Sequence, residues 1–183
     1  MQFRKTFIEG PYEFTPTTRK VENVQITETY NQILLESNGF NYKFIQDETI
    51  VVDKGVFIGI HCQMPPYTQG KLVTCLKGKI IDFAIDLRRG SDTYGQWESV
   101  ILDSEKMNQF WIPPGFGHAY YSLEDGSELS CRSTNLYDEK SEVVIDYRDE
   151  DFNLPLRDLK DIKVSKKDSE GISFMEFNKK NPW

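Results

Sequence analysis

The stretch Lys71-Leu-Val-Thr-Cys-Leu-Lys-Gly-Lys-Ile-Ile-Asp-Phe-Ala-Ile-Asp-Leu87 contains two runs of alternating residues on either side of Gly78. Both runs are rich in the β-branched and aromatic residues that favour half-buried strands, and the glycine between them favours a tight turn. Further short β-type runs follow, separated by turn sequences, at residues 98–102, 109–112, 118–123, 128–133 and 143–147. Many short strands at even spacing predict an all-β sandwich or barrel.

Few segments favour a helix. Residues 28–38 place Tyr30, Ile33 and Leu34 on one helical face and end at Asn38-Gly39, a sequence that commonly terminates a helix. This helix is expected to pack outside the β core. Residues 148–170 mix acidic and basic side chains, and we expect them to wrap the surface in short turns.

The composition is that of an ordinary globular protein. A length of 183 residues with 38% hydrophobic and 28% charged residues predicts one domain over residues 1–183. No apolar run approaches the ~18 residues of a membrane span. The first residues lack the apolar segment of a secretory signal, so a cytoplasmic protein is expected. The three cysteines form no CxxC pair and no even set, so we expect free thiols at Cys62, Cys75 and Cys131.

Charge is distributed unevenly along the chain. The net charge of −7 disfavours a nucleic-acid-binding protein, which neutralises phosphates with clustered lysines and arginines. Residues 54–89, however, carry six basic side chains against two acidic ones. A locally basic centre in an acidic protein favours one small anionic ligand. Charge alone fits a few solvated strand lysines equally well.

The two histidines each follow glycine, in Gly59-Ile-His61 and in Pro113-Pro-Gly-Phe-Gly-His118. The pattern Pro113-x-Gly115-x-x-His118 resembles the second cupin motif, which implies a jelly roll. Metal-binding cupins carry a second histidine where Gln63 stands here. Two histidines and a neutral amide fall short of the three or more ligands a divalent metal requires, so the sequence predicts no metal site. A metal-dependent cupin isomerase or dioxygenase stays as an alternative.

Several blocks of the chain carry a more specific resemblance. They are Gly55–Gln63, Gln69–Val73, Gly78–Ser91, Tyr94–Trp97 and Phe110–His118. In this order and spacing they resemble the dTDP-4-dehydrorhamnose 3,5-epimerase family, the sugar-nucleotide epimerases of the cupin superfold. The resemblance implies a cupin-type jelly roll with a few short peripheral helices. It also implies a homodimer. Each chain would then consist of an N-terminal segment that contacts the partner (1–45), a core (46–147) and a C-terminal wrapping segment (148–183).

The resemblance also implies a reaction. In this family a proton next to a 4-keto group is removed, an enolate forms, and a proton returns on the opposite face, without a metal or redox cofactor. His61 matches the general base, and Asp168 in Val164-Ser-Lys-Lys-Asp168 matches the carboxylate that orients it. Lys71 and His118 match positions that line the sugar. The remaining candidates for substrate binding are Gln46, Gln63, Cys131, Tyr137 and Arg132.

One departure from the family pattern concerns the second proton. Cys131 stands where the family carries the tyrosine that acts as general acid on the far face. A buried structural thiol is the more common role for such a cysteine, although a thiol can also donate a proton. The tyrosines that could replace the missing acid are Tyr120, Tyr121 and Tyr137.

Two further departures concern the nucleotide. The family has arginines that hold the diphosphate where this chain has Ile58 and Asn23. Neither side chain can make the bidentate contact of a guanidinium. A changed nucleotide or a changed placement is therefore expected, with compensation from basic residues such as Arg19, Lys20, Lys54 or Arg132.

The sequence therefore predicts a diverged epimerase of a nucleotide-linked 4-keto-6-deoxy sugar, in deoxysugar and cell-surface polysaccharide biosynthesis. It is expected to act at C3, at C5 or at both, with C3 alone as the first hypothesis. The nucleotide is expected to be dTDP, CDP or GDP, and the family resemblance implies a homodimer. Neither nucleic acid nor a membrane is expected as a partner. The alternative is a non-catalytic homologue that binds a sugar nucleotide without turnover.

Overall fold

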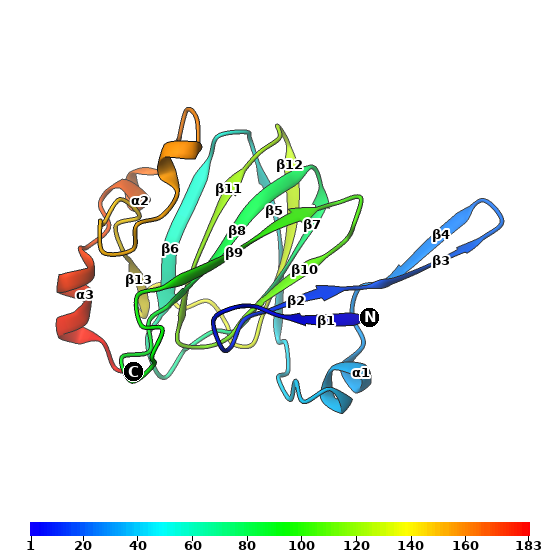
Figure 1. The fold of residues 1–183 in the computed structure, drawn as a ribbon, viewed down its shortest axis with the longest axis horizontal. Coiled ribbons are helices and arrows are strands. Elements are labelled where there is room, and N and C mark those ends of the chain that lie inside the picture. Colours follow the sequence, from blue (N-terminus) through cyan, green and yellow to red (C-terminus); the bar gives the residue numbers. More distant parts are fainter.

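The computed structural model describes residues 1–183 and contains two antiparallel sheets packed face to face (Figure 1). The six-stranded sheet has the order β1-β2-β10-β7-β12-β5, with strands Gln2–Lys5, Tyr12–Thr15, Gln109–Ile112, Lys71–Lys77, Ser127–Ser133 and Gln46–Val52. The five-stranded sheet has the order β13-β6-β11-β8-β9, with strands Glu142–Val144, Phe57–Gln63, Phe116–Ser122, Lys79–Asp86 and Trp97–Asp103. The predicted all-β sandwich is confirmed.

The glycine turn at Gly78 links the two sheets. Gly78 has a φ of +76°, a left-handed conformation that glycine adopts without a steric penalty. The strands on either side do not pair with each other, because β7 pairs with β10 and β12 whereas β8 pairs with β11 and β9. Alternation therefore gave the strands and the turn, but not the sheet to which each strand belongs.

The main core lies between the sheets. Along β12 the side chains alternate, so that Leu129, Cys131 and Ser133 are buried whereas Ser130 and Arg132 are less buried. The inward side chains join others from both sheets in one cluster of buried residues. All three cysteines are buried and free, as expected.

A second core lies between the five-stranded sheet and the C-terminal segment. Phe152, Phe174 and Phe177 from this segment pack with Phe57 and Phe83 of the sheet. Burying each phenylalanine contributes roughly 1.5–3 kcal/mol, so this segment is held firmly against the sheet. Within residues 148–170, where short turns were expected, it forms turns together with η1 at Leu156–Asp158 and α2 at Lys166–Ser169, and α3 follows at Phe174–Lys180.

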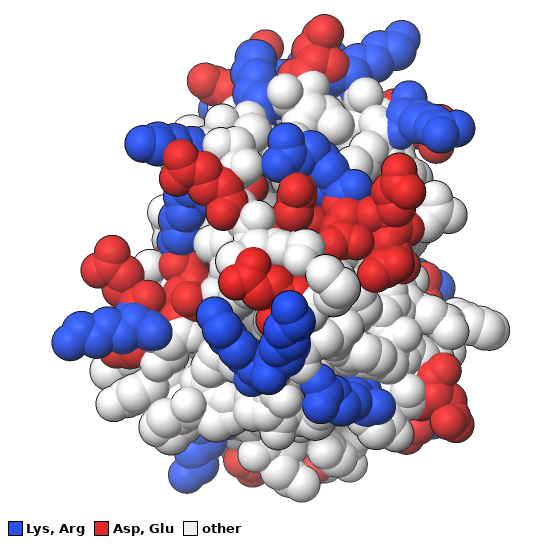
Figure 2. Space-filling view, turned by 90° about the vertical axis from the view of Figure 1, so that its left-hand side faces the viewer, with Lys and Arg blue, Asp and Glu red and all other residues white.

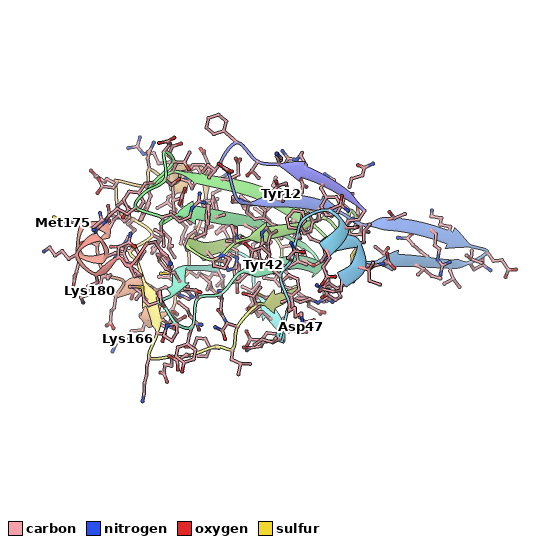
Figure 3. The ribbon with its side chains drawn as sticks, turned by 90° about the horizontal axis from the view of Figure 1, so that it is seen from below. Tyr12, Tyr42, Asp47, Lys166, Met175 and Lys180 are labelled. Atoms are coloured by element: carbon pink, nitrogen blue, oxygen red, sulfur yellow. The ribbon has the colours of Figure 1, made fainter.

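The surface over the C-terminal segment carries acidic and basic side chains intermixed (Figure 2). Viewed from below, Lys166, Met175 and Lys180 lie at the end of the molecule opposite the β3–β4 hairpin (Figure 3). The helices of this segment thus cover one side of the sandwich only. No helix of the chain is both long and apolar enough to cross a membrane.

The N-terminal residues form two strands of the six-stranded sheet, a separate hairpin and a short helix. Strands β1 and β2 extend the six-stranded sheet, while β3 (Thr17–Val21) and β4 (Val24–Glu28) form a separate hairpin that stands away from the sandwich (Figure 1). The predicted helix is shorter than expected, at α1 (Gln32–Ser37), and ends at Asn38.

The face of α1 that packs on the sandwich differs from the prediction. Its buried residue is Leu35, whereas Ile33 is 79% exposed. Leu35 packs with Phe14, Leu72 and Trp111, so α1 lies on the outer side of the six-stranded sheet, outside the main core as expected. The helix begins later than predicted because the Asn31 side chain caps it by accepting a hydrogen bond from Leu34 N.

Candidate active site

A cavity of about 250 Å³ opens between the two sheets. Its lining includes both histidines and comes from both sheets and from the C-terminal segment: Glu48, Ile50, Ile58, His61, Gln69, Lys71, His118, Tyr120, Cys131, Ser133, Tyr137, Glu142 and Lys167. A larger pocket of about 660 Å³ lies next to it, near α2 and α3, and shares Glu142 and Lys167 with it. The smaller cavity is the better candidate, because both histidines line it together with Glu142, a carboxylate neighbour of His61.

His61 reaches the cavity through an irregularity in its strand. His61 is the ladder partner of His118, but the register shifts between this pair and the next, so that Ile58 pairs with Tyr120. Gly59 lies in the shifted stretch with a φ of +116°, and a Cβ there would lie 2.5 Å from the carbonyl oxygen of His118. A glycine is therefore required, and the shift lets Ile58 and His61 both line the cavity.

Asp168 holds one side of the His61 ring. Its Oδ1 lies 2.5 Å from His61 Nε2 and accepts a hydrogen bond from Gly59 N at 3.2 Å. Its Oδ2 accepts from Ser165 Oγ at 2.5 Å, and the Ser165 side chain in turn caps α2. Burial alone would raise the pKa of Asp168, but the hydrogen bonds from His61 and Ser165 outweigh it and lower the pKa. Asp168 is therefore an ionised carboxylate behind the imidazole.

Glu142 lies on the other side of the ring. Its Oε1 is 3.5 Å from His61 Nδ1, and its Oε2 accepts a hydrogen bond from the Tyr137 hydroxyl at 2.9 Å and forms an ion pair with Lys167. Burial would raise the pKa of Glu142, but Lys167 and His61 together lower it. Sequence reasoning missed this residue, because nothing local distinguishes Glu142 from other acidic residues at the start of a strand.

His118 makes a second histidine–aspartate pair. His118 Nε2 lies 2.6 Å from Asp82 Oδ1, and both side chains are buried. Burial raises the pKa of Asp82 and lowers the pKa of His118, and it outweighs the attraction between them. Burial therefore favours the neutral form of both groups. Asp82 was not predicted, although it is ladder partner to Tyr120 on the neighbouring strand.

Lys71 and Cys131 line the cavity from the six-stranded sheet. Burial raises the pKa of the Cys131 thiol to about 11, although Lys71 opposes this effect. The thiol is thus protonated near neutral pH. Tyr137 lies at the edge of the same cavity, with its backbone N–H bonded to Gln46 Oε1 at 2.7 Å.

Four of the predicted residues do not line the cavity, namely Asp168, which lies behind the His61 ring, and Gln46, Gln63 and Arg132. Gln46 holds the backbone of Tyr137, and Gln63 is buried where it donates to the Tyr67 and Leu136 carbonyl oxygens. Arg132 occupies the face of β12 opposite Cys131, and its Nε lies 3.0 Å from Asp47 Oδ2. No three His, Cys, Asp or Glu side chains are grouped so that they could hold a metal ion.

The family model of the dTDP-4-dehydrorhamnose 3,5-epimerases matches residues 5–176. The chain belongs to this family. It is 36% identical over 169 residues to the dTDP-4-dehydrorhamnose 3,5-epimerase of Methanothermobacter thermautotrophicus, covering 91% of each chain. The Shigella flexneri enzyme of the same name is 36% identical over 173 residues, which cover 91% of this chain and 96% of that protein.

Solved structures of the family share the fold. The dTDP-4-dehydrorhamnose 3,5-epimerase of Elizabethkingia anophelis aligns with a TM-score of 0.90 at 33% identity, covering 97% of this chain and 98% of that one. The dTDP-6-deoxy-D-glucose-3,5-epimerase of Legionella pneumophila, in complex with dTDP-4-keto-L-rhamnose, aligns with a TM-score of 0.89 at 34% identity, covering 94% and 92%. The predicted family and the cupin-type jelly roll are confirmed.

The departures from the dTDP-4-dehydrorhamnose 3,5-epimerase pattern fall in two places. Cys131 and Ile58 both line the cavity, so the departures expected at these two positions lie within the site itself. Asn23 lies in the turn between β3 and β4, on the hairpin that stands away from the sandwich (Figure 1). It therefore lies outside the cavity within one chain.

Proposed function

We propose that this protein is an isomerase that inverts a carbon next to the ketone of a nucleotide-linked 4-keto-6-deoxy sugar. The observation that carries the proposal is the His61 imidazole, which lines the cavity with its Nε2 held 2.5 Å from the ionised Asp168. An imidazole fixed in this way by a carboxylate is a general base. Family membership supports the substrate class.

The arrangement of charges supports proton abstraction. With its Nε2–H donated to Asp168, His61 has a lone pair on Nδ1, on the opposite side of the ring. Nδ1 takes the proton from the carbon, and the bonding electrons move to the ketone oxygen as an enolate. Asp168 and Glu142 stabilise the imidazolium, while Lys71 and His118 are positioned to stabilise the enolate oxygen. Neither a metal nor a redox cofactor is needed in this scheme.

We place the inversion at C3 rather than at C5. Cys131 occupies the cavity position where the family carries the tyrosine that matters most for inversion at C5. Ile58 lines the cavity where the family has an arginine, and it cannot bind a diphosphate as a guanidinium does. We therefore propose dTDP, CDP or GDP as the nucleotide. The substrates therefore need to be compared directly.

We also propose a homodimer in which the β3–β4 hairpin contacts the partner subunit. Three apolar side chains on this hairpin are exposed in the single chain, namely Val21, Val24 and Ile26. Covering them would remove apolar surface from water. Light scattering should give the mass of two chains, and a monomer at micromolar concentration would contradict the proposal.

The test of the reaction is proton NMR in D₂O with the dTDP-, CDP- and GDP-linked 4-keto-6-deoxy sugars. We expect deuterium to enter at C3 with inversion for one of the nucleotides. Uptake at C5 alone would contradict the assignment of the carbon and keep the reaction class. No uptake with any of the substrates would contradict the enzymatic proposal.

A non-catalytic homologue is the second candidate, favoured by the replacement of the family tyrosine by the buried thiol of Cys131. Such a protein would bind one of the sugar nucleotides in a calorimetric titration and leave both carbons unexchanged. Retention of the His61–Asp168 pair in the cavity favours the enzyme, because binding alone needs no base.

A further inference from the structure

The hydroxyls of three tyrosines near the site have different surroundings. Tyr121 points to the second core, and its hydroxyl donates to the Lys160 carbonyl oxygen at 2.6 Å. The hydroxyl of Tyr137 donates to Glu142 at 2.9 Å. Tyr120 lines the cavity itself, next to His118, with the two ring centroids 5.8 Å apart.

The Tyr120 hydroxyl is free to interact with a ligand. It makes no hydrogen bond with the protein. The side-chain nitrogen and oxygen atoms that are both fully buried and without a partner are Asp82 Oδ2 and Gln109 Oε1, so the Tyr120 hydroxyl is not fully buried. The hydroxyl of Tyr120 is therefore open to the cavity, although the residue as a whole is 3% exposed. A phenol hydroxyl that has no hydrogen-bond partner and is accessible from the cavity can both donate a hydrogen bond to a ligand and accept one.

The side chain of Tyr120 extends across the gap between the sheets. It starts from β11 in the five-stranded sheet and packs in the same buried cluster as Cys131 on β12 of the six-stranded sheet. After burial, the largest effect on the pKa of Tyr120 is the repulsion from Cys131, which raises it further. Because stacked sheets lie about 10 Å apart, the hydroxyl comes near β12, which contributes Cys131 and Ser133 to the cavity wall.

This placement gives the cavity a proton donor beside the position that Cys131 occupies. A thiol is a weak hydrogen-bond donor, whereas a phenol hydroxyl is a strong one. Burial also keeps Tyr120 protonated, because its pKa is raised above the ordinary value. A donor displaced from the family position on β12 to β11 of the facing sheet is suited to one carbon of the sugar rather than to two.

We infer that Tyr120 is the catalytic acid that returns the proton on the face of the sugar opposite His61. This inference rests on the proposed function. His61 Nδ1 takes the proton as the C–H bond breaks and the electrons move to the ketone oxygen. The Tyr120 O–H bond then breaks as the new C–H bond forms and the carbonyl is restored. The phenolate regains a proton from water, and the imidazolium releases its proton to water, so no oxidant or reductant is required.

The experiment compares Tyr120→Phe with Tyr121→Phe in the D₂O assay. Tyr120→Phe removes a hydroxyl that has no protein partner, so the fold should be unaffected. We expect inversion to fall by about 10²–10⁴-fold, which is the usual contribution of a general acid. Deuterium should still enter at the same carbon with retained configuration, because His61 can remove and return a proton on its own face. Tyr121→Phe, whose hydroxyl points to the second core, should invert at the wild-type rate.

Exchange without inversion is the readout that a purely structural role would not produce. Inversion by Tyr120→Phe at the wild-type rate would overturn the inference. So would loss of inversion in Cys131→Ala together with normal inversion in Tyr120→Phe, because the thiol would then be the donor. Loss of both exchange and inversion in Tyr120→Phe would assign the hydroxyl to binding and also overturn it. Absence of exchange in the wild type would instead remove the proposed function, and the inference with it.

Discussion

The molecule contains two histidine–aspartate pairs whose histidines, His61 and His118, are ladder partners on neighbouring strands. The distances are almost the same, 2.5 Å for His61–Asp168 and 2.6 Å for His118–Asp82. Their surroundings differ. Both oxygens of Asp168 accept hydrogen bonds, whereas Asp82 Oδ2 is buried without a hydrogen-bond partner. The same two residue types thus form a charged carboxylate with a usable base in one pair, whereas burial favours the neutral form of both groups in the other.

The difference comes from the elements behind each aspartate. Asp168 lies on a short helix whose cap, Ser165, donates to its carboxylate, and the backbone of Gly59 donates as well. Asp82 lies in the middle of β8, where the backbone groups are engaged in the ladder with β9 and β11. A carboxylate without enough donors is more stable protonated in a buried site. Donor supply, more than the distance within the pair, therefore sets the charge.

Replacing residues of the first pair should have the largest effect. His61→Ala removes the base and should bring deuterium uptake below detection. Asp168→Asn should reduce uptake by about 10²–10⁴-fold, because an amide N–H donated to Nε2 would force the ring proton onto Nδ1. NMR in D₂O measures both, with thermal melting to verify the fold. Normal uptake in either variant would remove that residue from the mechanism.

The same change in the second pair should have a much smaller effect. Asp82→Asn exchanges a neutral carboxyl group for a neutral amide of similar shape, and the amide can still donate to His118 Nε2. We expect less than a tenfold loss of exchange, equivalent to about 1.4 kcal/mol or less. The assay is again deuterium uptake. A loss as large as that of Asp168→Asn would show that Asp82 is ionised in the folded protein.

The two aspartates should also respond to pH with opposite signs. The pKa of Asp168 is lowered from 3.8 by folding, so its contribution to stability is present above that value and is lost as the pH falls through the folded pKa. The pKa of Asp82 is raised from 3.8, so its contribution is complete below that value and is lost as the pH rises through the folded pKa.

Urea unfolding of the wild type and the two asparagine variants, from about pH 3 to about pH 8, measures these contributions. The advantage of the wild type over Asp168→Asn should shrink toward acid, and its advantage over Asp82→Asn should shrink toward neutral pH. Two difference curves of the same sign would contradict the assigned charge states.

Local patterns accounted for most of the fold and for part of the site. Alternation predicted the strands that carry His118 and Cys131, and the glycine-containing motifs drew attention to both histidines. Asp168 was found only through the family resemblance, because its pairing with His61 spans 107 residues along the chain. The pairing of β7 and β8 with other strands was unpredictable for the same reason, since sheet order depends on contacts far apart in sequence.

Other features could have been found from the sequence. Arg132 follows Cys131 in a strand, so the two-residue period alone places them on opposite faces of β12. Ser173 and Glu176, a serine followed three residues later by a glutamate, form a pattern that is typical of a helix start and predicts α3. In the structure the Ser173 side chain accepts a hydrogen bond from Glu176 N. Neither Glu142 nor Lys167 has such a signal, because each acquires its role only by folding next to His61.

A further contrast between the pairs is that His61 has a second carboxylate neighbour in Glu142, whereas His118 has Asp82 alone. Glu142→Gln should slow exchange about tenfold, because the imidazolium loses a stabilising charge that Lys167 already neutralises in part. Glu170→Gln, which removes an exposed carboxylate paired with Lys166, is the matched control and should leave exchange unchanged. A loss above a hundredfold for Glu142→Gln would make Glu142 the base itself. An unchanged rate would reduce it to a structural partner of Lys167 and leave Asp168 as the one carboxylate on which the difference between the pairs depends.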